Sequence, residues 1–179
     1  MTNPGSSIAL SLILKLTPKE QSNVQLLSAL AGLACQQVLE THYQLAARIK
    51  WPNDVLIEGQ KCAGILVEAA WQENVLVGVV MGIGVNLFPG SVPPSDQVRF
   101  PATYVQAHTP LYIDKYLFLE NLLKSIFLWR TLFNSDHFYN QYQKTMAFRG
   151  ETVYIYHNNG THFSGTLLGI ERNGDLRLA

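Results

Sequence analysis

The sequence predicts an α+β fold, in which a mixed and largely antiparallel sheet is packed by helices and is followed by the beginning of a small β-barrel-like domain. Three observations support this expectation. Apolar residues recur with helical spacing on both sides of a central stretch. That stretch consists of β-prone segments separated by turn residues. After Gly150, short strand candidates are joined by Asn-Gly pairs, which favour hairpins.

Length and composition are those of a folded domain, alone or with a small appendage. Hydrophobic residues make up 47% of the 179 residues and charged residues 15%, which provides a sizeable core. Lysine plus arginine equals aspartate plus glutamate, 13 each, so we expect no nucleic-acid partner and no membrane partner. Cys35 and Cys62 lie in apolar contexts, which predicts free, buried thiols and a cytoplasmic location.

The first elements are a strand from Ser7 to Leu16 and a long helix. Thr17 is placed to cap the helix, Pro18 suits its first position, and Glu20 completes a capping box. The helix is predicted to continue to the region of Thr41 to Tyr43. Its buried face is marked by Val24, Leu27, Ala31, Ala34 and Val38.

A meander of strands follows, over residues 46–51, 55–58, 61–71 and 75–87. The connecting turns are predicted at Pro52-Asn53-Asp54, Gly59-Gln60 and Glu73-Asn74. Continuous Val and Ile runs indicate strands that helices cover on both faces. Residues 89–101 contain four prolines and are predicted to form an irregular surface loop.

Two more helices and a second β region complete the chain. Asp114 is placed to cap a helix that runs to about Phe133, and Ser135 caps a third, amphipathic helix. Beyond Gly150, strands are expected over residues 152–157, 161–170 and 176–178. Asn159-Gly160 and Asn173-Gly174 are the expected turns between them. These strands are too few to close a barrel.

The central stretch holds three polar clusters, and each has an ordinary structural explanation when taken alone. The clusters are Lys50-Trp51-Pro52-Asn53-Asp54, Lys61-Cys62-Ala63-Gly64 and Gly82-Ile83-Gly84-Val85-Asn86. Asn-Asp after proline is usually a turn, and the third cluster cannot be a dinucleotide fingerprint because Phe88-Pro89-Gly90 prevents the helix that should follow.

Taken together, the clusters predict one binding site. A meander brings both lysines to one edge of the sheet, where an ammonium suits a phosphate or a carboxylate. Glycines within strands allow a ligand to approach the backbone, and the amide of Asn86 can donate and accept hydrogen bonds. The expected ligand is anionic and partly flat.

These motifs, in this order, resemble the biotin–protein ligase family. KWPND is followed by K-x-AGIL-x-E and then by G-x-G-x-N, and the resemblance is dense from Gly5 to Arg130. It implies a class II synthetase-like catalytic domain at residues 1–147, incomplete at its N-terminal side, and an incomplete SH3-like domain at residues 148–179. The implied fold agrees with the one predicted from the residue patterns.

The resemblance also implies a reaction, its substrates and its partners. ATP, with Mg²⁺, activates biotin to biotinyl-5'-AMP, and the biotinyl group passes to a lysine of a biotin carboxyl carrier protein, a subunit of acetyl-CoA carboxylase. Dimerisation through the sheet is common in the family, so a homodimer is a further expectation.

Individual roles follow by matching positions to the family's motifs. The implied catalytic residues are Lys61 and Asp54. The implied biotin-binding residues are Lys61, Gly64, Leu66, Gly82 and Gly84. The implied ATP- and adenylate-binding residues are Lys50, Trp51, Asn53, Asp54 and Asn86, and Asp54 is also the implied contact to Mg²⁺ through ATP.

The sequence departs from the family pattern in two respects. The G-R-G-R-x-G-R loop that closes over the adenylate is not in the sequence, and neither are the earlier Ser, Thr and Gln residues that read biotin's ureido group. We therefore expect weak or no ligase activity from this polypeptide. A lipoate–protein-ligase-like enzyme and a non-catalytic fragment that binds biotin or the carrier remain as alternatives, while DNA binding has no support.

Overall fold

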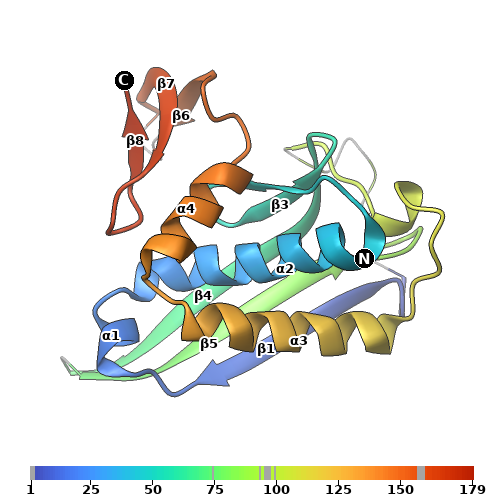
Figure 1. Cartoon of the computed structure of the whole chain (residues 1–179), viewed down its shortest axis with the longest axis horizontal. Helices are drawn as coiled ribbons and strands as arrows, with labels where there is room; N and C mark the ends of the chain where they lie inside the picture. The colour runs from blue at the N-terminus through green and yellow to red at the C-terminus, as the bar shows by residue number, and fades with distance from the viewer. Residues whose placement is uncertain (1–2, 74, 93, 95–97, 99, 157–159) are drawn as a thin grey trace.

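The fold is built on a five-stranded antiparallel sheet with the strand order β1-β5-β4-β3-β2 (Figure 1). The computed structural model describes residues 3–73, 75–92, 94, 98, 100–156 and 160–179. The strands are β1 Ser7–Leu14, β2 Arg48–Lys50, β3 Asp54–Ile57, β4 Gln60–Gln72 and β5 Val75–Asn86. The α+β class and the antiparallel meander predicted from the sequence are therefore confirmed.

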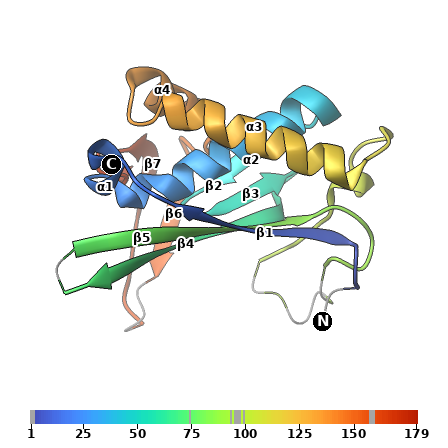
Figure 2. The same ribbon diagram turned by 90° about the horizontal axis from the view of Figure 1, so that it is seen from below.

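The helices lie on one face of this sheet, so the expectation of cover on both faces is wrong. They are α2 Leu27–Tyr43, α3 Lys115–Thr131 and α4 Asp136–Thr145. Figure 2 shows all three on the same side, with α2 over the strands and α3 beside it. Val79, Met81 and Ile83 of β5 face the helices and are buried. Among the described residues, no helix lies on the opposite face, which we call the open face (Figure 2).

The first predicted helix is interrupted. Thr17 forms the expected capping box with Glu20, but α1 ends after one turn, at Pro18–Gln21, and the 3₁₀ helix η1 Val24–Leu26 precedes α2. Ser22 Oγ donates to Pro18 O and Asn23 Nδ2 donates to Lys19 O. These side-chain bonds satisfy carbonyls that a continuing helix would use, which favours a break.

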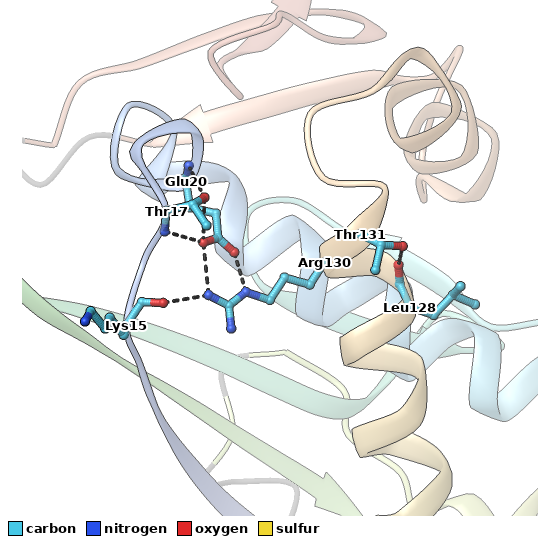
Figure 3. Close-up of polar contacts among 6 residues, drawn as sticks. All are labelled: Lys15, Thr17, Glu20, Leu128, Arg130 and Thr131. Atoms are coloured by element: carbon cyan, nitrogen blue, oxygen red, sulfur yellow. Dashed lines mark hydrogen bonds and ion pairs between the residues drawn. The ribbon is translucent and has the colours of Figure 1, made fainter.

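An ion pair connects α1 to the far end of α3 (Figure 3). Arg130 pairs with Glu20, whose carboxylate also accepts hydrogen bonds from Thr17 N at 2.7 Å and Thr17 Oγ1 at 2.9 Å. Arg130 Nη2 also donates to Lys15 O, just beyond β1. Burial raises the pKa of the Glu20 carboxyl, but the hydrogen bonds from Arg130 and Thr17 outweigh burial, so this pKa lies below its ordinary value.

The remaining helix starts confirm the sequence analysis, and one turn corrects it. Asp114 Oδ1 accepts from two amides at the start of α3, and Ser135 Oγ accepts from Phe138 N at the start of α4. The β3–β4 loop is Glu58-Gly59, not Gly59-Gln60, with φ of 49° and 75°. A two-residue hairpin with two positive φ values matches the right-handed twist of its strands. Asn74, predicted in the next turn, lies outside the described residues.

A separate three-stranded sheet follows α4, with the order β6 Thr152–Tyr156, β7 His162–Ile170 and β8 Leu176–Leu178. Asn173-Gly174 lies in the β7–β8 turn, where Gly174 has φ of 90°. The Asn159-Gly160 turn involves Asn159, which lies outside the described residues, and the SH3-like character of this sheet stays a prediction. Cys35 and Cys62 are free and buried. No helix in the described part of the chain is long and apolar enough to span a membrane.

Candidate functional site

The KWPND segment forms the turn between β2 and β3. Lys50 and Asp54 are partners in the ladder at the base of this turn. Asn53 extends the neighbouring ladder, because Asn53 O accepts from Ile65 N at 2.8 Å and Asn53 Nδ2 donates to Ile65 O at 2.8 Å. The turn is therefore fastened to β4, and the beginning of β3 is held against Gly64.

A β-bulge decides which face of the sheet carries Lys61. In the β3–β4 ladder Val55 pairs with Ala63 while Leu56 pairs with Lys61, so Cys62 is an extra residue on β4. Strict alternation from Gly64, on the open face, would place Lys61 among the helices. The inserted residue restores Lys61 to the open face and leaves Cys62 buried.

Lys50, Asp54 and Lys61 form one charge cluster. Lys61 Nζ lies 2.5 Å from Asp54 Oδ1, and Lys50 Nζ lies 3.4 Å from Asp54 Oδ2. Asp54 is buried, whereas both lysine side chains are partly exposed. Lys50 Nζ also lies 5.0 Å from the centroid of the Phe100 ring, a cation–π contact. The cluster carries one net positive charge and faces the open side of the sheet.

Glycines make the floor beside this cluster flat. Gly84 is paired with Gly64 on one side and Ala9 on the other, and Gly82 is paired with Leu66 and Ser11. A Cβ on Gly84 would meet nothing closer than a carbonyl oxygen at 3.9 Å, so no protein atom explains the missing side chain. The absence of side chains there leaves the backbone open to a ligand.

Gly64 is different, because the lysine itself occupies the space above it. A Cβ on Gly64 would lie 3.1 Å from both Cε and Nζ of Lys61. Glycine at this position therefore lets the ammonium rest on the strand and reach Asp54. A larger residue would displace the charge that the sequence analysis assigned to the reaction.

These features surround an open hollow of about 390 Å³ on the open face. Six of the predicted site residues line it: Asn53, Lys61, Gly64, Leu66, Gly82 and Gly84. Asp54 joins it through its ion pair with Lys61, and Lys50 joins it through its own ion pair with Asp54. Sequence reasoning missed Ala9, Leu10 and Ser11 of β1, which also line it. Small residues at alternate positions of β1 were the available signal, but the pairing of β1 with β5 was not visible in the sequence.

Trp51 and Asn86 are placed differently from what their predicted roles suggest. Trp51 Nε1 donates to Gly174 O at 3.0 Å, so its indole faces the C-terminal sheet and a separate hollow of about 150 Å³. Asn86 Nδ2 donates to Thr103 O at 3.1 Å. Both side chains therefore have structural partners and neither is among the residues that line the open-face hollow, and the nucleotide contacts expected of them stay predictions.

The described residues do not provide a ready metal centre. They contain no group of three or more His, Cys, Asp or Glu side chains arranged to hold an ion. Asp54, the residue expected to meet Mg²⁺, has its two oxygens against two ammonium groups. These donors do not fit a resident Mg²⁺ ion in this arrangement.

Comparison with known proteins identifies the family. The sequence model of the Biotin/lipoate A/B protein ligase family matches residues 1–86. Over 184 residues the chain is 33% identical to the biotin–[acetyl-CoA-carboxylase] ligase of Paracoccus denitrificans, covering 98% of this chain and 75% of that protein. The chain belongs to the biotin protein ligase family.

Two further relatives define the extent of this similarity. The chain is 34% identical over 119 residues to the bifunctional ligase/repressor BirA of Bacillus spizizenii, which covers 66% of this chain but 36% of that protein. A structure of the biotin protein ligase of Aquifex aeolicus in complex with biotin and ATP superposes with a TM-score of 0.80 and 26% identity, covering 97% of this chain and 71% of the other.

Proposed function

We propose that this chain carries the catalytic site of a biotin–protein ligase. In the first step a carboxylate oxygen of biotin attacks the α-phosphorus of ATP, and biotinyl-5'-AMP and pyrophosphate form. In the second step a lysine amine of a carrier protein attacks the carbonyl carbon of the adenylate. An amide forms, AMP leaves, and the amine loses a proton. The supporting observation is the Lys61 ammonium lying on Gly64 at the head of a glycine floor.

The first step brings together two anions, which repel each other, and the positive charge of the cluster reduces that repulsion. A unit positive charge about 4 Å from a negative one is worth roughly 4 kcal/mol at an effective dielectric constant near 20. Lys61 is the group nearest the floor, so we assign it the biotin carboxylate and the α-phosphate. Lys50, at the other oxygen of Asp54, is assigned to the nucleotide side.

Asp54 holds both lysines in place before substrate arrives. Its carboxylate is buried and contacts the two ammonium groups, so it fixes their separation and orientation. The same carboxylate is the candidate to orient, or to take a proton from, the incoming carrier lysine. Mg²⁺ would enter with the triphosphate of ATP as part of the substrate.

The flat floor suits the other half of the ligand. Gly82 and Gly84 offer bare backbone to a ring, and Leu66, 59% exposed, offers an apolar side chain at the rim. When an apolar group covers an exposed leucine beside two glycines, apolar surface leaves water and the free energy falls. We assign biotin's bicyclic ring to this floor, with Asn53 and Asn86 beside the nucleotide.

The partners and the setting belong to the same proposal. The names of the relatives support a biotin carboxyl carrier protein of acetyl-CoA carboxylase as the acceptor, with biotin and ATP as small substrates. A cytoplasmic location and a homodimer formed through the sheet are further parts of the proposal, and light scattering at several protein concentrations tests the dimer.

A direct assay tests the activity. The chain is incubated with biotin, ATP, Mg²⁺ and a carrier domain, and biotinylation is followed by mass over long times, because we expect turnover well below that of a complete ligase. Lys61→Ala should lower the rate about 10²-fold, the typical cost of removing one preorganised charge-stabilising group. Lys124→Ala is the matched control, because Lys124 is an exposed lysine paired with Glu120 on α3. Equal rates for wild type and Lys61→Ala, or faster turnover of lipoate than of biotin, would contradict the proposal.

A further inference from the structure

Beyond the end of β5, a short segment pairs with β4 at Lys61. The β5 strand ends at Asn86, and beyond it residues 101–103 run parallel to β4. Lys61 N donates to Pro101 O at 2.7 Å, and Thr103 N donates to Lys61 O at 2.9 Å. Both backbone groups of Lys61 on this side are therefore satisfied by a segment that belongs to no long strand.

The same segment also contacts Asn86. Asn86 Nδ2 donates to Thr103 O at 3.1 Å, so one residue, Thr103, is bonded to Lys61 through its amide and to Asn86 through its carbonyl. Thr103 therefore links the two predicted site residues. Thr103 itself is 6% exposed, so the protein atoms packed around it fix its position.

The hydroxyl of Thr103 is held by a third residue. Thr103 Oγ1 lies 2.7 Å from His108 Nε2, within one turn of the 3₁₀ helix η3 Val105–Ala107. His108 Nδ1 lies 3.3 Å from Oε2 of Glu58, in the β3–β4 turn, and the Glu58 side chain is 76% exposed. A carboxylate at Nδ1 favours the proton on that nitrogen, which leaves Nε2 to accept a hydrogen bond from the hydroxyl.

We propose that Thr103 is a positioning residue of the ligase site, held by His108 and Glu58, and that it sets the place of Lys61 and Asn86. This inference rests on the proposed function, because it concerns the same site. The contacts run from the exposed Glu58 carboxylate through the imidazole and the buried hydroxyl to the backbone beneath the functional lysine. Neither His108 nor Thr103 is among the residues that line the open-face hollow, so both act through Lys61 and Asn86.

The test compares four variants, Thr103→Val, Thr103→Ser, Thr109→Val and His108→Phe, by two readouts. Thr103→Val removes the hydroxyl at nearly constant shape, and Thr103→Ser keeps it. Thr109→Val is the matched control, since Thr109 is equally buried and donates to Tyr43 O, away from the site. The readouts are calorimetric affinity for a non-hydrolysable biotinyl-adenylate analogue and hydrogen exchange of the Lys61 and Thr103 amides.

We expect Thr103→Val to weaken analogue binding about fivefold and to accelerate exchange of both amides by a similar factor, the effect of one neutral hydrogen bond. Thr103→Ser should restore both values. Thr109→Val should lower the Tm without changing either. His108→Phe, which keeps a ring but loses both nitrogens, should act like Thr103→Val and serves if that variant does not fold.

The two readouts separate failure of this inference from failure of the proposed function. Wild type that does not bind the analogue contradicts the ligase proposal, while exchange of the two amides still tests the positioning. Unchanged exchange at Lys61 in both Thr103→Val and His108→Phe would overturn the inference. So would loss of analogue affinity in Thr109→Val as large as in Thr103→Val.

Discussion

Gly84 is a residue whose missing side chain serves the hollow and not the fold. A Cβ added there meets only a carbonyl oxygen, at 3.9 Å, and the φ of Gly84 is not in the left-handed region. Gly84→Val should therefore leave the free energy of unfolding within about 0.5 kcal/mol of wild type. It should lower affinity for a biotinyl-adenylate analogue at least tenfold by filling the floor.

Gly78→Val provides the control for that change. Gly78 lies on the same strand and has no atom within 4 Å of its added Cβ, but it is outside the hollow. Calorimetric titration should show wild-type affinity for Gly78→Val. Equal affinities for both variants would remove the glycine floor from the site.

Glu20 gives the fold a predictable dependence on pH. Its pKa in the folded protein lies below the ordinary value of 4.5, so its contribution to stability is fully present above that value. The contribution is lost as pH falls through the folded-state pKa. Glu20→Gln should cost about 2 kcal/mol at pH 7, from the loss of charge-assisted hydrogen bonds, and progressively less below about pH 4.5. Chemical denaturation at several pH values measures this.

Glu120→Gln is the matched control for Glu20→Gln. Glu120 pairs with Lys124 on α3, but both side chains are largely exposed to solvent. Its loss should change the unfolding free energy by less than about 0.5 kcal/mol at any pH. A cost that did not depend on pH would mean that Glu20 acts through packing and not through charge.

At the scale of elements, the bond from Trp51 couples the KWPND turn to the C-terminal sheet. Trp51→Phe removes the indole N–H donor to Gly174 O and keeps an aromatic ring. We expect a loss of about 1 kcal/mol, concentrated in opening of β7 and β8. Hydrogen exchange should accelerate there while the amides of α2 stay protected.

Trp129→Phe tests whether the Trp51 effect is local. The indole of Trp129 donates to Gln37 Oε1 at 2.8 Å, inside the helix layer. Its loss should accelerate exchange in α2 and α3 and leave β7 and β8 unchanged. If both variants gave the same pattern, the Trp51 bond would not be a specific link between the two sheets.

Elements show where sequence patterns are sufficient. N-cap residues depend on local chemistry, so the starts of α1, α3 and α4 were predictable from the capping box at Thr17 and from the caps Asp114 and Ser135. The break after α1 was missed because the helical periodicity of apolar residues continues through it. The bulge at Cys62 was also invisible, since a bulge is defined by the partner strand and not by its own residues.

At the scale of the whole molecule, the alkylation rates of the two buried thiols measure whether the core unfolds cooperatively. Cys35 and Cys62 are completely buried in one core, and burial raises the pKa of Cys35 to about 12 and raises that of Cys62. At pH 8 neither forms appreciable thiolate in the folded state. Alkylation of both should be about 10³-fold slower than in denaturant, and the two should react together. Rapid labelling of one cysteine in native buffer would reveal local opening of this core.

The open face explains why the candidate site was predictable while its surroundings were not. Lys61, Gly64 and Gly84 lie in short motifs whose residue types alone suggest an anion and a close approach. The Val and Ile runs suggested that helices cover both faces of the sheet. In the structure, large apolar residues buried under the helices alternate along the strands with small residues on the open face. Which face a residue occupies depends on register, and register is a property of paired strands.

Because of that alternation along β5, selection for core packing and selection for the shape of the hollow act on different residues. Met81 and Val85 contribute to the core, whereas Gly82 and Gly84, their immediate neighbours, line the hollow. A substitution that changes ligand preference therefore need not disturb packing, and a core substitution need not alter the pocket. Ligand preference and thermal tolerance can consequently evolve along the same strand by independent, single-residue steps.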